Sequence, residues 1–113
     1  MSDCIFCKIL AGKIPSKKAF ENDDLLAFHD VNAQAPVHLL VIPKRHVATL
    51  DEARDEDRDL LGKILLAIPE IARANGIAGA YRVVNNCGAE AGQSVFHIHF
   101  HLLGGREMTW PPG

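Results

Sequence analysis

The sequence is poor in aromatic residues and in cysteine, and it has no long apolar run. Its 113 residues include one Trp, one Tyr and three Cys. An odd number of cysteines does not form a disulfide framework, which favours an intracellular, cytoplasmic protein. No apolar run approaches the roughly 20 residues of a membrane span, and charged residues interrupt the N-terminus, where a signal peptide needs an apolar stretch. We therefore expect no membrane partner and no export.

An excess of charge of one sign is lacking as well. Twelve Lys and Arg residues stand against fourteen Asp and Glu residues, for a net charge of −2. A non-specific nucleic-acid binder needs a strongly basic face, so we expect no nucleic-acid partner. The chain is long enough for one domain over residues 1–113, whose folding buries somewhat over ~60% of the surface of the unfolded chain.

The hydrophobic pattern predicts a mixed fold of helices and strands. A short helix is expected over residues 4–11, followed by a glycine and a proline that suit its C-terminal end. Alternating or continuous apolar runs bounded by turn residues predict the strands. These strands are expected over 18–21, 25–30, 37–42, 81–85 and 95–103.

A long helix is predicted between the third and the fourth strand. Its apolar face is expected to consist of Leu61, Ile64, Leu65, Ile68 and Ala72, which recur at helical spacing. The acid-rich residues 51–59 suit a solvated start of this helix, and Asn75-Gly76 suits its end. Pro69 predicts a kink or a restart. The order of elements indicates an α+β fold with a five-stranded antiparallel sheet, one long helix and one short helix.

Three of the six histidines lie at alternate positions of the last predicted strand. Alternation places His97, His99 and His101 on one face, with neighbours about 7 Å apart. The other face is predicted to face the core and consists of Phe96, Ile98, Phe100 and Leu102.

This pattern leaves three interpretations open: surface histidines, two zinc ligands with a third from elsewhere, or nucleophilic and acid–base chemistry on an anion. The glycine-bearing loop before the strand favours the third interpretation. Exposed N–H groups around Gly92, Gln93 and Ser94 can bind a phosphate.

Two of the three cysteines are spaced for chelation. Cys4 and Cys7 share one face of the short predicted helix. A thioredoxin-like redox pair is disfavoured, because no strand precedes the motif. Two buried cysteines that act as small hydrophobes remain the alternative. Cys87 has no partner in sequence, and we interpret it as loop filler rather than as a reactive thiol.

The segment His97–Leu103 resembles the His-φ-His-φ-His-φ-φ motif of the histidine triad (HIT) superfamily. Residues 27–46, 81–86 and 92–105, together with the WPPG ending, resemble its Hint branch, so the resemblance covers nearly the whole chain. It implies a HIT-like fold whose sheet continues across a homodimer, with the C-terminal tail near the partner's active site. Trp110 in this tail fits an interface anchor, and packing on its own domain is the alternative.

The resemblance also implies an activity. Hint-like proteins bind purine nucleoside monophosphates and hydrolyse nucleoside 5′-phosphoramidates through a nucleotidyl-histidine intermediate, without a cofactor for catalysis. A dinucleoside polyphosphate hydrolase and a non-catalytic nucleotide-binding or scaffolding protein are the alternatives. A nucleotidyl-transferase is disfavoured, because that branch replaces the last histidine of the triad, whereas this chain keeps His101.

The resemblance also implies a functional role for each position that matches the family motif. By this resemblance His99 is the nucleophile and His101 donates to the phosphate oxygens, where negative charge develops. His38 supports these imidazoles, Asp30 binds the ribose hydroxyls, and Ser94 either lies near the leaving group or caps a turn. The other positions implied to bind nucleotide are Asn86, Gly92 and Gln93 for the ribose and phosphate, and Ile14, Phe28, His29 and Val31 for the purine.

Some bacterial HIT proteins pair the C-x-x-C motif with two histidines, which correspond here to His46 and His97. Together with Cys4 and Cys7, the resemblance implies a closed Cys₂His₂ set suited to structural zinc. His97 would then support the structure and leave catalysis to His99 and His101.

Overall fold

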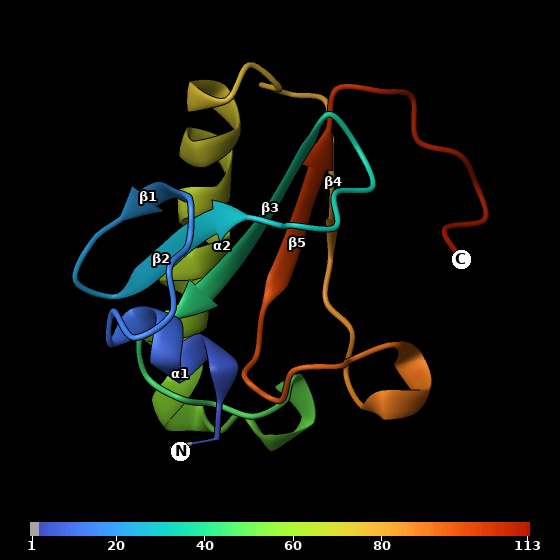
Figure 1. Ribbon diagram of the computed structural model, residues 1–113. Coiled ribbons are helices and arrows are strands. Elements are labelled where there is room, and N and C mark those ends of the chain that lie inside the picture. Colours follow the sequence, from blue (N-terminus) through green and yellow to red (C-terminus); the bar gives the residue numbers. More distant parts are fainter. Residues whose placement is uncertain (1–2) are drawn as a thin grey trace.

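Five antiparallel strands form one sheet in the computed structural model of the protein (Figure 1), which describes residues 3–113. The order of the strands in the sheet is β1-β2-β3-β5-β4, and every neighbouring pair is antiparallel. The strands are β1 (Lys18–Glu21), β2 (Leu25–His29), β3 (Val37–Pro43), β4 (Tyr81–Val84) and β5 (Phe100–Gly104). The two α-helices are α1 (Ile5–Leu10) and α2 (Arg58–Ala74). The predicted α+β architecture is confirmed.

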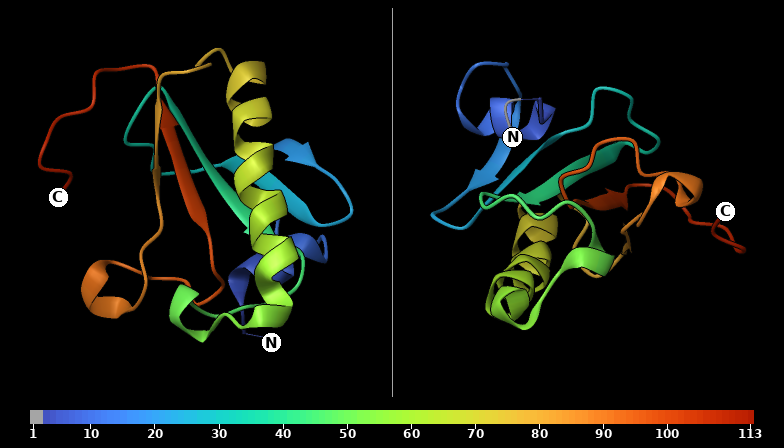
Figure 2. Two further views of the ribbon diagram at one scale, coloured as in Figure 1. Left: turned by 180° about the vertical axis from the view of Figure 1, so that it is seen from behind. Right: turned by 90° about the horizontal axis from the view of Figure 1, so that it is seen from below.

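The two helices cover opposite faces of the sheet (Figure 2). This arrangement explains why β2 and β3 are apolar at consecutive positions: odd and even residues enter different cores. The core on the α2 side includes Leu25, Ala27, Leu39, Val41, Ile64, Ile68, Ile71, Phe100 and Leu102. The core on the α1 side consists of Phe6, Ile9, Leu26, Phe28, Leu40 and Ile42.

Helix α2 differs from its prediction at both its start and its middle. The acid-rich segment forms two short 3₁₀ turns, Leu50–Glu52 and Asp55–Asp57, and the α-helix begins only at Arg58. The helix continues through Pro69 without a break, so of the two predicted outcomes, a kink or a restart, the restart was wrong. Pro69 is exposed, and the carbonyl that it leaves unbonded, four residues earlier, belongs to the exposed Leu65 and is open to water.

The predicted apolar face of α2 was wrong at Leu65, whose side chain is 48% exposed. The buried positions are Ile64, Ile68, Ile71 and Ala72, so the stripe that packs on the sheet is rotated from Leu65 towards Ile71. No helix within residues 3–113 has the length and the apolar character that a membrane span requires.

The last strand is shorter than predicted. Strand β5 begins at Phe100, and residues 95–99 lie outside the regular strand. The neighbouring strand ends at Pro43, which has no N–H group to donate to a continued ladder. Instead, the Pro43 carbonyl accepts a hydrogen bond from the His97 ring at 2.8 Å. Phe96, predicted in the core, is therefore turned outward and is 46% exposed, so the single alternating face predicted over 95–103 was wrong in its first half.

Candidate functional site

A cavity of about 550 Å³ lies on the α1 side of the sheet. Strand β2 and the loop before β1 contribute apolar residues to its wall; β2 also contributes His29, and β5 with its preceding loop contributes His99 and His101. The residues that line it and that sequence reasoning singles out are Ile14, Phe28, His29, Asp30, Val31, Ser94, His99 and His101. The cavity thus combines a mostly apolar wall with three imidazoles, one carboxylate, two hydroxyls and one lysine amine.

Sequence reasoning misses one wall of this cavity, which helix α1 supplies. Ile5, Phe6 and Ile9 line the cavity from the helix, and Leu40 lines it from β3. The signal in the sequence is the helical spacing of these three apolar residues beside the two cysteines. Without the tertiary structure that spacing indicates only a buried helix face.

Hydrogen bonds determine the tautomer of His38 and, through it, that of His101. The Gln34 N–H donates to Nδ1 of His38 at 2.9 Å, so the proton of the neutral His38 ring is on Nε2. That Nε2 lies 2.9 Å from Nδ1 of His101 and 3.3 Å from Oδ2 of Asp30. Nδ1 of His101 therefore accepts, and the His101 proton is on Nε2, where it is available to an anion in the cavity.

A second pair of hydrogen bonds determines the tautomers of His99 and His97. Nδ1–H of His99 donates to the His97 carbonyl at 2.8 Å, which leaves the lone pair of His99 on Nε2. Nε2–H of His97 donates to the Pro43 carbonyl at 2.8 Å, which leaves its lone pair on Nδ1. The two histidines therefore present unprotonated nitrogens in different settings: His99 lines the cavity, and His97 is fully buried.

Burial lowers the pKa of three of the histidines, His38, His97 and His101. Desolvation lowers the pKa of His101 to about 4, assisted by the positive charge that His99 and His38 would carry. Desolvation likewise lowers the pKa of His97 to about 4. It also lowers the pKa of His38, against the opposing effect of the Asp30 carboxylate. While His101 is neutral, its Nδ1 can accept the hydrogen bond from Nε2–H of His38. A proton on Nδ1 of His101 would break this hydrogen bond.

We expect the free energy of unfolding to fall as the pH drops from about 6.5 towards about 4. In that window the unfolded chain protonates His101 and the folded chain does not, so acid favours the unfolded state. One histidine contributes at most about 1.4 kcal/mol per pH unit. Urea unfolding between about pH 7 and about pH 4.5 measures the dependence. The His101→Gln variant should show a shallower dependence on pH, and an unchanged slope would contradict the role of His101.

Three residues predicted to contact the ribose and phosphate, Asn86, Gly92 and Gln93, do not line the cavity. The Gln93 side chain donates to the Ala48 and Val95 carbonyls and accepts from the Gly88 N–H. The N–H groups of Gly92 and Gln93 donate to carbonyls of the same loop. The structure therefore gives Gln93 the task of bracing the loop, and Ser94 is the member of the predicted phosphate-binding trio that lines the cavity.

The two asparagines at the start of this loop differ in their partners. The side chain of Asn86 lies against Gly92, where a Cβ would come within 3.6 Å of its Nδ2. The preceding Asn85, which sequence reasoning misses, donates from Nδ2 to the His99 carbonyl at 2.9 Å. Asn85 therefore holds the backbone of His99 from the side of β4.

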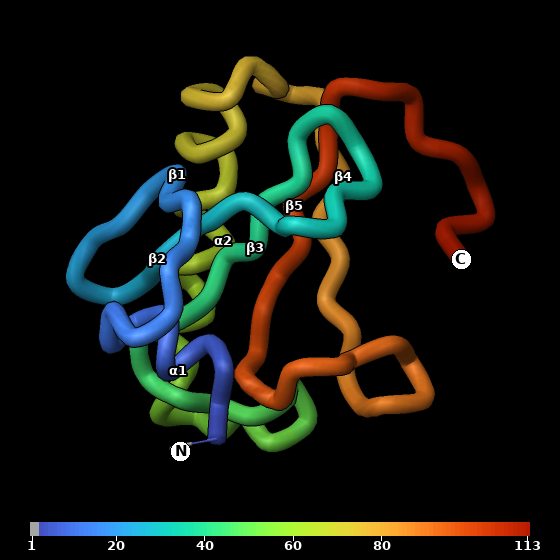
Figure 3. Tube along the Cα trace, in the orientation of Figure 1, coloured from blue at the N-terminus to red at the C-terminus, as the bar shows by residue number. Residues whose placement is uncertain are grey.

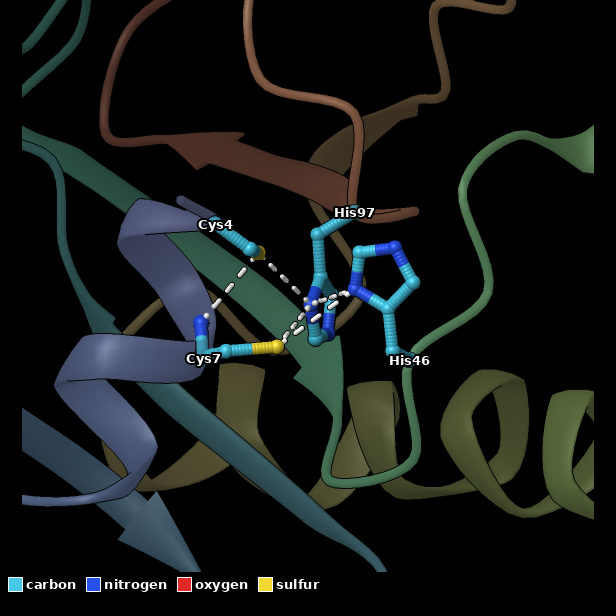
Figure 4. A group of neighbouring side chains, drawn as sticks. All are labelled: Cys4, Cys7, His46 and His97. Carbon is cyan, nitrogen blue, oxygen red and sulfur yellow. Dashed lines mark hydrogen bonds between the residues drawn. The ribbon is translucent and has the colours of Figure 1, made fainter. Parts of the chain in front are cut away.

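A second cluster lies beside α1 and joins four residues from distant parts of the chain (Figure 4). Cys4 caps the start of α1 and Cys7 lies in it, His46 follows β3, and His97 precedes β5. The Sγ atoms of Cys4 and Cys7 lie 3.4 and 3.6 Å from Nδ1 of His97. Cys7 Sγ lies 3.4 Å from Nδ1 of His46, and the two Nδ1 atoms are 3.2 Å apart. These four side chains are close enough to hold one metal ion.

Asp30, His38 and His101 form another compact group of possible ligands. In this group the Gln34 N–H occupies the Nδ1 lone pair of His38, so His38 carries its proton on Nε2, the atom that faces the other two residues. A protonated nitrogen cannot ligate a metal ion. The hydrogen bonds therefore favour a row of hydrogen-bonded histidines with fixed tautomers at this place over a metal site.

Comparison with known proteins agrees with this arrangement. Residues 11–108 match the HIT domain family. An uncharacterized HIT-like protein of Synechocystis is 52% identical over 111 residues, which cover 98% of this chain and 97% of that protein. Among solved structures, a HIT family hydrolase from Legionella pneumophila has a TM-score of 0.96 at 51% identity, covering 98% of this chain and all of the other.

More distant structures share the same fold. A histidine triad protein from Clostridium difficile has a TM-score of 0.92 at 44% identity and covers 96% of both chains. A histidine triad nucleotide-binding protein from Candida albicans has a TM-score of 0.82 at 35% identity, covering 96% of this chain and 83% of the other. With alternate histidines ahead of and within its last strand and a match over most of its length, the chain belongs to the HIT domain family.

Proposed function

We propose that this chain is a purine nucleotide-binding hydrolase that cleaves nucleoside 5′-phosphoramidates through a nucleotidyl-His99 intermediate. One observation carries the proposal: His99 lines an apolar cavity, and its Nδ1–H is committed to the His97 carbonyl, so Nε2 presents a lone pair. Neutral imidazole is a competent nucleophile near pH 7. The relatives described as a HIT family hydrolase and as a histidine triad nucleotide-binding protein support the same activity class.

The proposed reaction depends on the tautomers of His38, His99 and His101. Nε2 of His99 attacks the α-phosphorus, the P–N bond breaks, and the leaving nitrogen takes a proton from solvent to depart as the amine. Nε2–H of His101, whose ring centroid is 5.2 Å from that of His99, donates to a non-bridging phosphate oxygen, where charge accumulates. Water then cleaves the nucleotidyl-histidine and regenerates His99. The Ser94 hydroxyl, which lines the cavity, is available to hydrogen-bond the leaving nitrogen.

The apolar wall suits a purine. Ile14, Phe28 and Val31 line the cavity together with the α1 residues, and a flat apolar base binds in a slot of this kind. Val31 is fully exposed at the rim, where a bound base would cover it. Asp30 lines the same cavity, and its carboxylate lies within 4.8 Å of the His101 ring nitrogen. A carboxylate beside the proposed phosphate contact suits the ribose hydroxyls, which adjoin the phosphate in a nucleotide.

Turnover of adenosine 5′-monophosphoramidate and of a diadenosine polyphosphate by the purified chain tests the proposed activity. Faster turnover of the phosphoramidate supports the proposal. Turnover of the dinucleotide alone would identify a dinucleoside polyphosphate hydrolase instead. Binding of AMP with no turnover of either compound would indicate a non-catalytic nucleotide-binding protein.

We expect Asp30→Ala to weaken AMP binding by at least about tenfold, because a hydrogen bond to a charged group contributes about 1.5–3 kcal/mol net of the competing bonds to water. The loss should be much smaller for an AMP analogue that lacks both ribose hydroxyls. Isothermal titration with the two ligands separates this contact from the separate effect of Asp30 on His38, which both ligands share. An equal loss for both ligands would contradict the assignment to the ribose.

We infer that the four-residue cluster beside α1 binds structural zinc. Ligands at about 2.3 Å (sulfur) and about 2.0 Å (nitrogen) from a tetrahedral zinc ion lie about 3.3–3.6 Å from one another across S–N and N–N pairs. The distances of 3.2–3.6 Å between these atoms fit that geometry. The hydrogen bond from His97 to Pro43 is the kind of outer contact that orients a ligating imidazole. Four protein ligands leave no position for substrate, so the site is structural.

A homodimer is also part of the proposal. Strand β4 is an edge of the sheet and carries the exposed Val83, so it is open to pairing with a second copy. The tail after β5 extends away from the rest of the chain (Figure 3). Trp110 in this tail is 81% exposed, with the Arg82 guanidinium 5.9 Å from its ring centroid. An exposed Trp of this kind favours the interface anchor over packing on its own domain.

A further inference from the structure

Phe6 lies between the two cysteines of α1, and its ring reaches the proposed active site. The ring is buried, with 6% of its surface exposed. Its centroid is 5.9 Å from that of the metal-ligand candidate His97 and 5.2 Å from that of His99, both in edge-to-face geometry. It is also 5.5 Å from the ring of Phe28 on the opposite cavity wall. One side chain therefore contacts the metal cluster, the proposed nucleophile and the purine wall.

The position of Phe6 depends on what holds α1. This helix has six residues, and a helix of that length is not stable by itself. Its N-terminal end is held by the Cys7 N–H, which donates to Cys4 Sγ at 3.3 Å. The Sγ atom of Cys4 faces His97, and the Sγ atom of Cys7 faces His46. A metal ion bound there would thus fix α1 to the loops that follow β3 and precede β5.

A second contact links the same cluster to His99. The His97 carbonyl accepts the Nδ1–H of His99 at 2.8 Å, so the backbone of one metal-ligand candidate determines the tautomer of the proposed nucleophile. Phe6 and this carbonyl constrain the His99 ring from two directions. A metal ion bound to the cluster would fix the position of both the Phe6 ring and the His97 carbonyl. Neither of them is a proposed contact to the nucleotide phosphate.

We propose that Phe6 is a positioning residue that couples metal binding at Cys4, Cys7, His46 and His97 to nucleotide binding beside His99. The inference rests on the proposed nucleotide site and zinc site, and it adds that each ligand increases the affinity of the chain for the other. Coupling between two sites is reciprocal, so the factor is the same in both directions. Couplings carried by packed side chains are typically about 5- to 150-fold.

The test measures the zinc affinity of the full chain by competition with a chromogenic chelator, with and without saturating AMP. In the parent, AMP should increase the zinc affinity by about 10-fold. In Phe6→Leu, which keeps an apolar side chain but loses the ring edge, this factor should fall to about 2-fold or less. Circular dichroism of both proteins in the chelator confirms that the metal-free chains remain folded. If Phe6→Leu does not fold, Phe6→Met replaces it.

Leu10→Ala is the matched control. Leu10 belongs to the same helix and packs on the same core without lining the cavity, so this variant should keep the coupling factor of the parent. Zinc and AMP that bind independently in the parent would overturn the inference and leave both proposed sites intact. Coupling that Phe6→Leu keeps would overturn the role of Phe6. A parent that binds no zinc, or no AMP, would refute the corresponding site and the inference with it.

Discussion

Replacement of His99 by alanine should lower the rate of phosphoramidate hydrolysis by at least about 10³-fold, while AMP binding stays within a few-fold of the parent. Loss of a covalent nucleophile removes the intermediate itself, and measured losses for such residues reach about 10⁶-fold. The imidazole contributes less to binding, because the cavity has many other lining groups. The measurements are single-turnover hydrolysis of adenosine 5′-monophosphoramidate and titration with AMP.

A trapped intermediate makes this test specific. Parent protein quenched with denaturant at alkaline pH, where a P–N bond to histidine survives, should carry a nucleotidyl adduct on the peptide that contains His99, and the His99→Ala protein should carry none. His29→Ala is the control, because His29 lines the same cavity but is assigned to the purine. It should change AMP affinity and keep the adduct. Hydrolysis by His99→Ala within a few-fold of the parent would refute the assignment of the nucleophile.

Replacement of Cys7 by serine should abolish zinc binding and lower the thermal midpoint by more than about 10 °C. An ion present at about 1,000 times its dissociation constant stabilises the folded state by about 4 kcal/mol. For a domain of this size each kcal/mol shifts the midpoint by about 4 °C. Cys7 faces both His46 and His97, so its thiolate is central to the site. Elemental analysis of protein purified without added metal and thermal unfolding check the two effects.

Cys87→Ser is the matched control, because the same substitution is made at a half-buried cysteine outside the cluster. It should keep both the zinc content and the thermal midpoint. A strong chelator should lower the midpoint of the parent to that of Cys7→Ser and leave Cys7→Ser unchanged. Parent protein that contains no zinc although its thiols are intact would show that the cluster is not a zinc site.

Much of the fold could be predicted because its signals are local. Helical and alternating periodicity repeat within a few residues, so the bounds predicted for β2 and β3 differ from the observed bounds by one residue. The core positions Ile98, Phe100 and Leu102 were likewise correct. Periodicity was less reliable where one face of an element borders solvent, as at Leu65, because the direction in which the buried stripe points depends on what packs against it.

The candidate site likewise has features that the sequence shows and features that only the structure shows. The alternate histidines and the C-x-x-C motif are visible in the sequence, and so is the resemblance that pairs His46 and His97 with the cysteines. The structure adds a role for Gln93 that no local pattern indicates, because this side chain braces a loop through partners as far away as Ala48, and its contact with the nucleotide stays a prediction. Asn85 and the cavity wall formed by α1 were missed, since no local pattern separates a core residue from one that lines a cavity.

By itself the sequence determined which residue types are available: three alternate histidines, a pair of cysteines and an apolar surround. Only the tertiary structure decided which nitrogen of each histidine is free. That choice depends on single hydrogen-bond partners that no sequence pattern reveals, such as the Pro43 carbonyl for His97, 54 residues away, and the Gln34 N–H for His38. A neutral imidazole has one proton and two nitrogens that can carry it, and the hydrogen-bond partner that folding supplies selects between them.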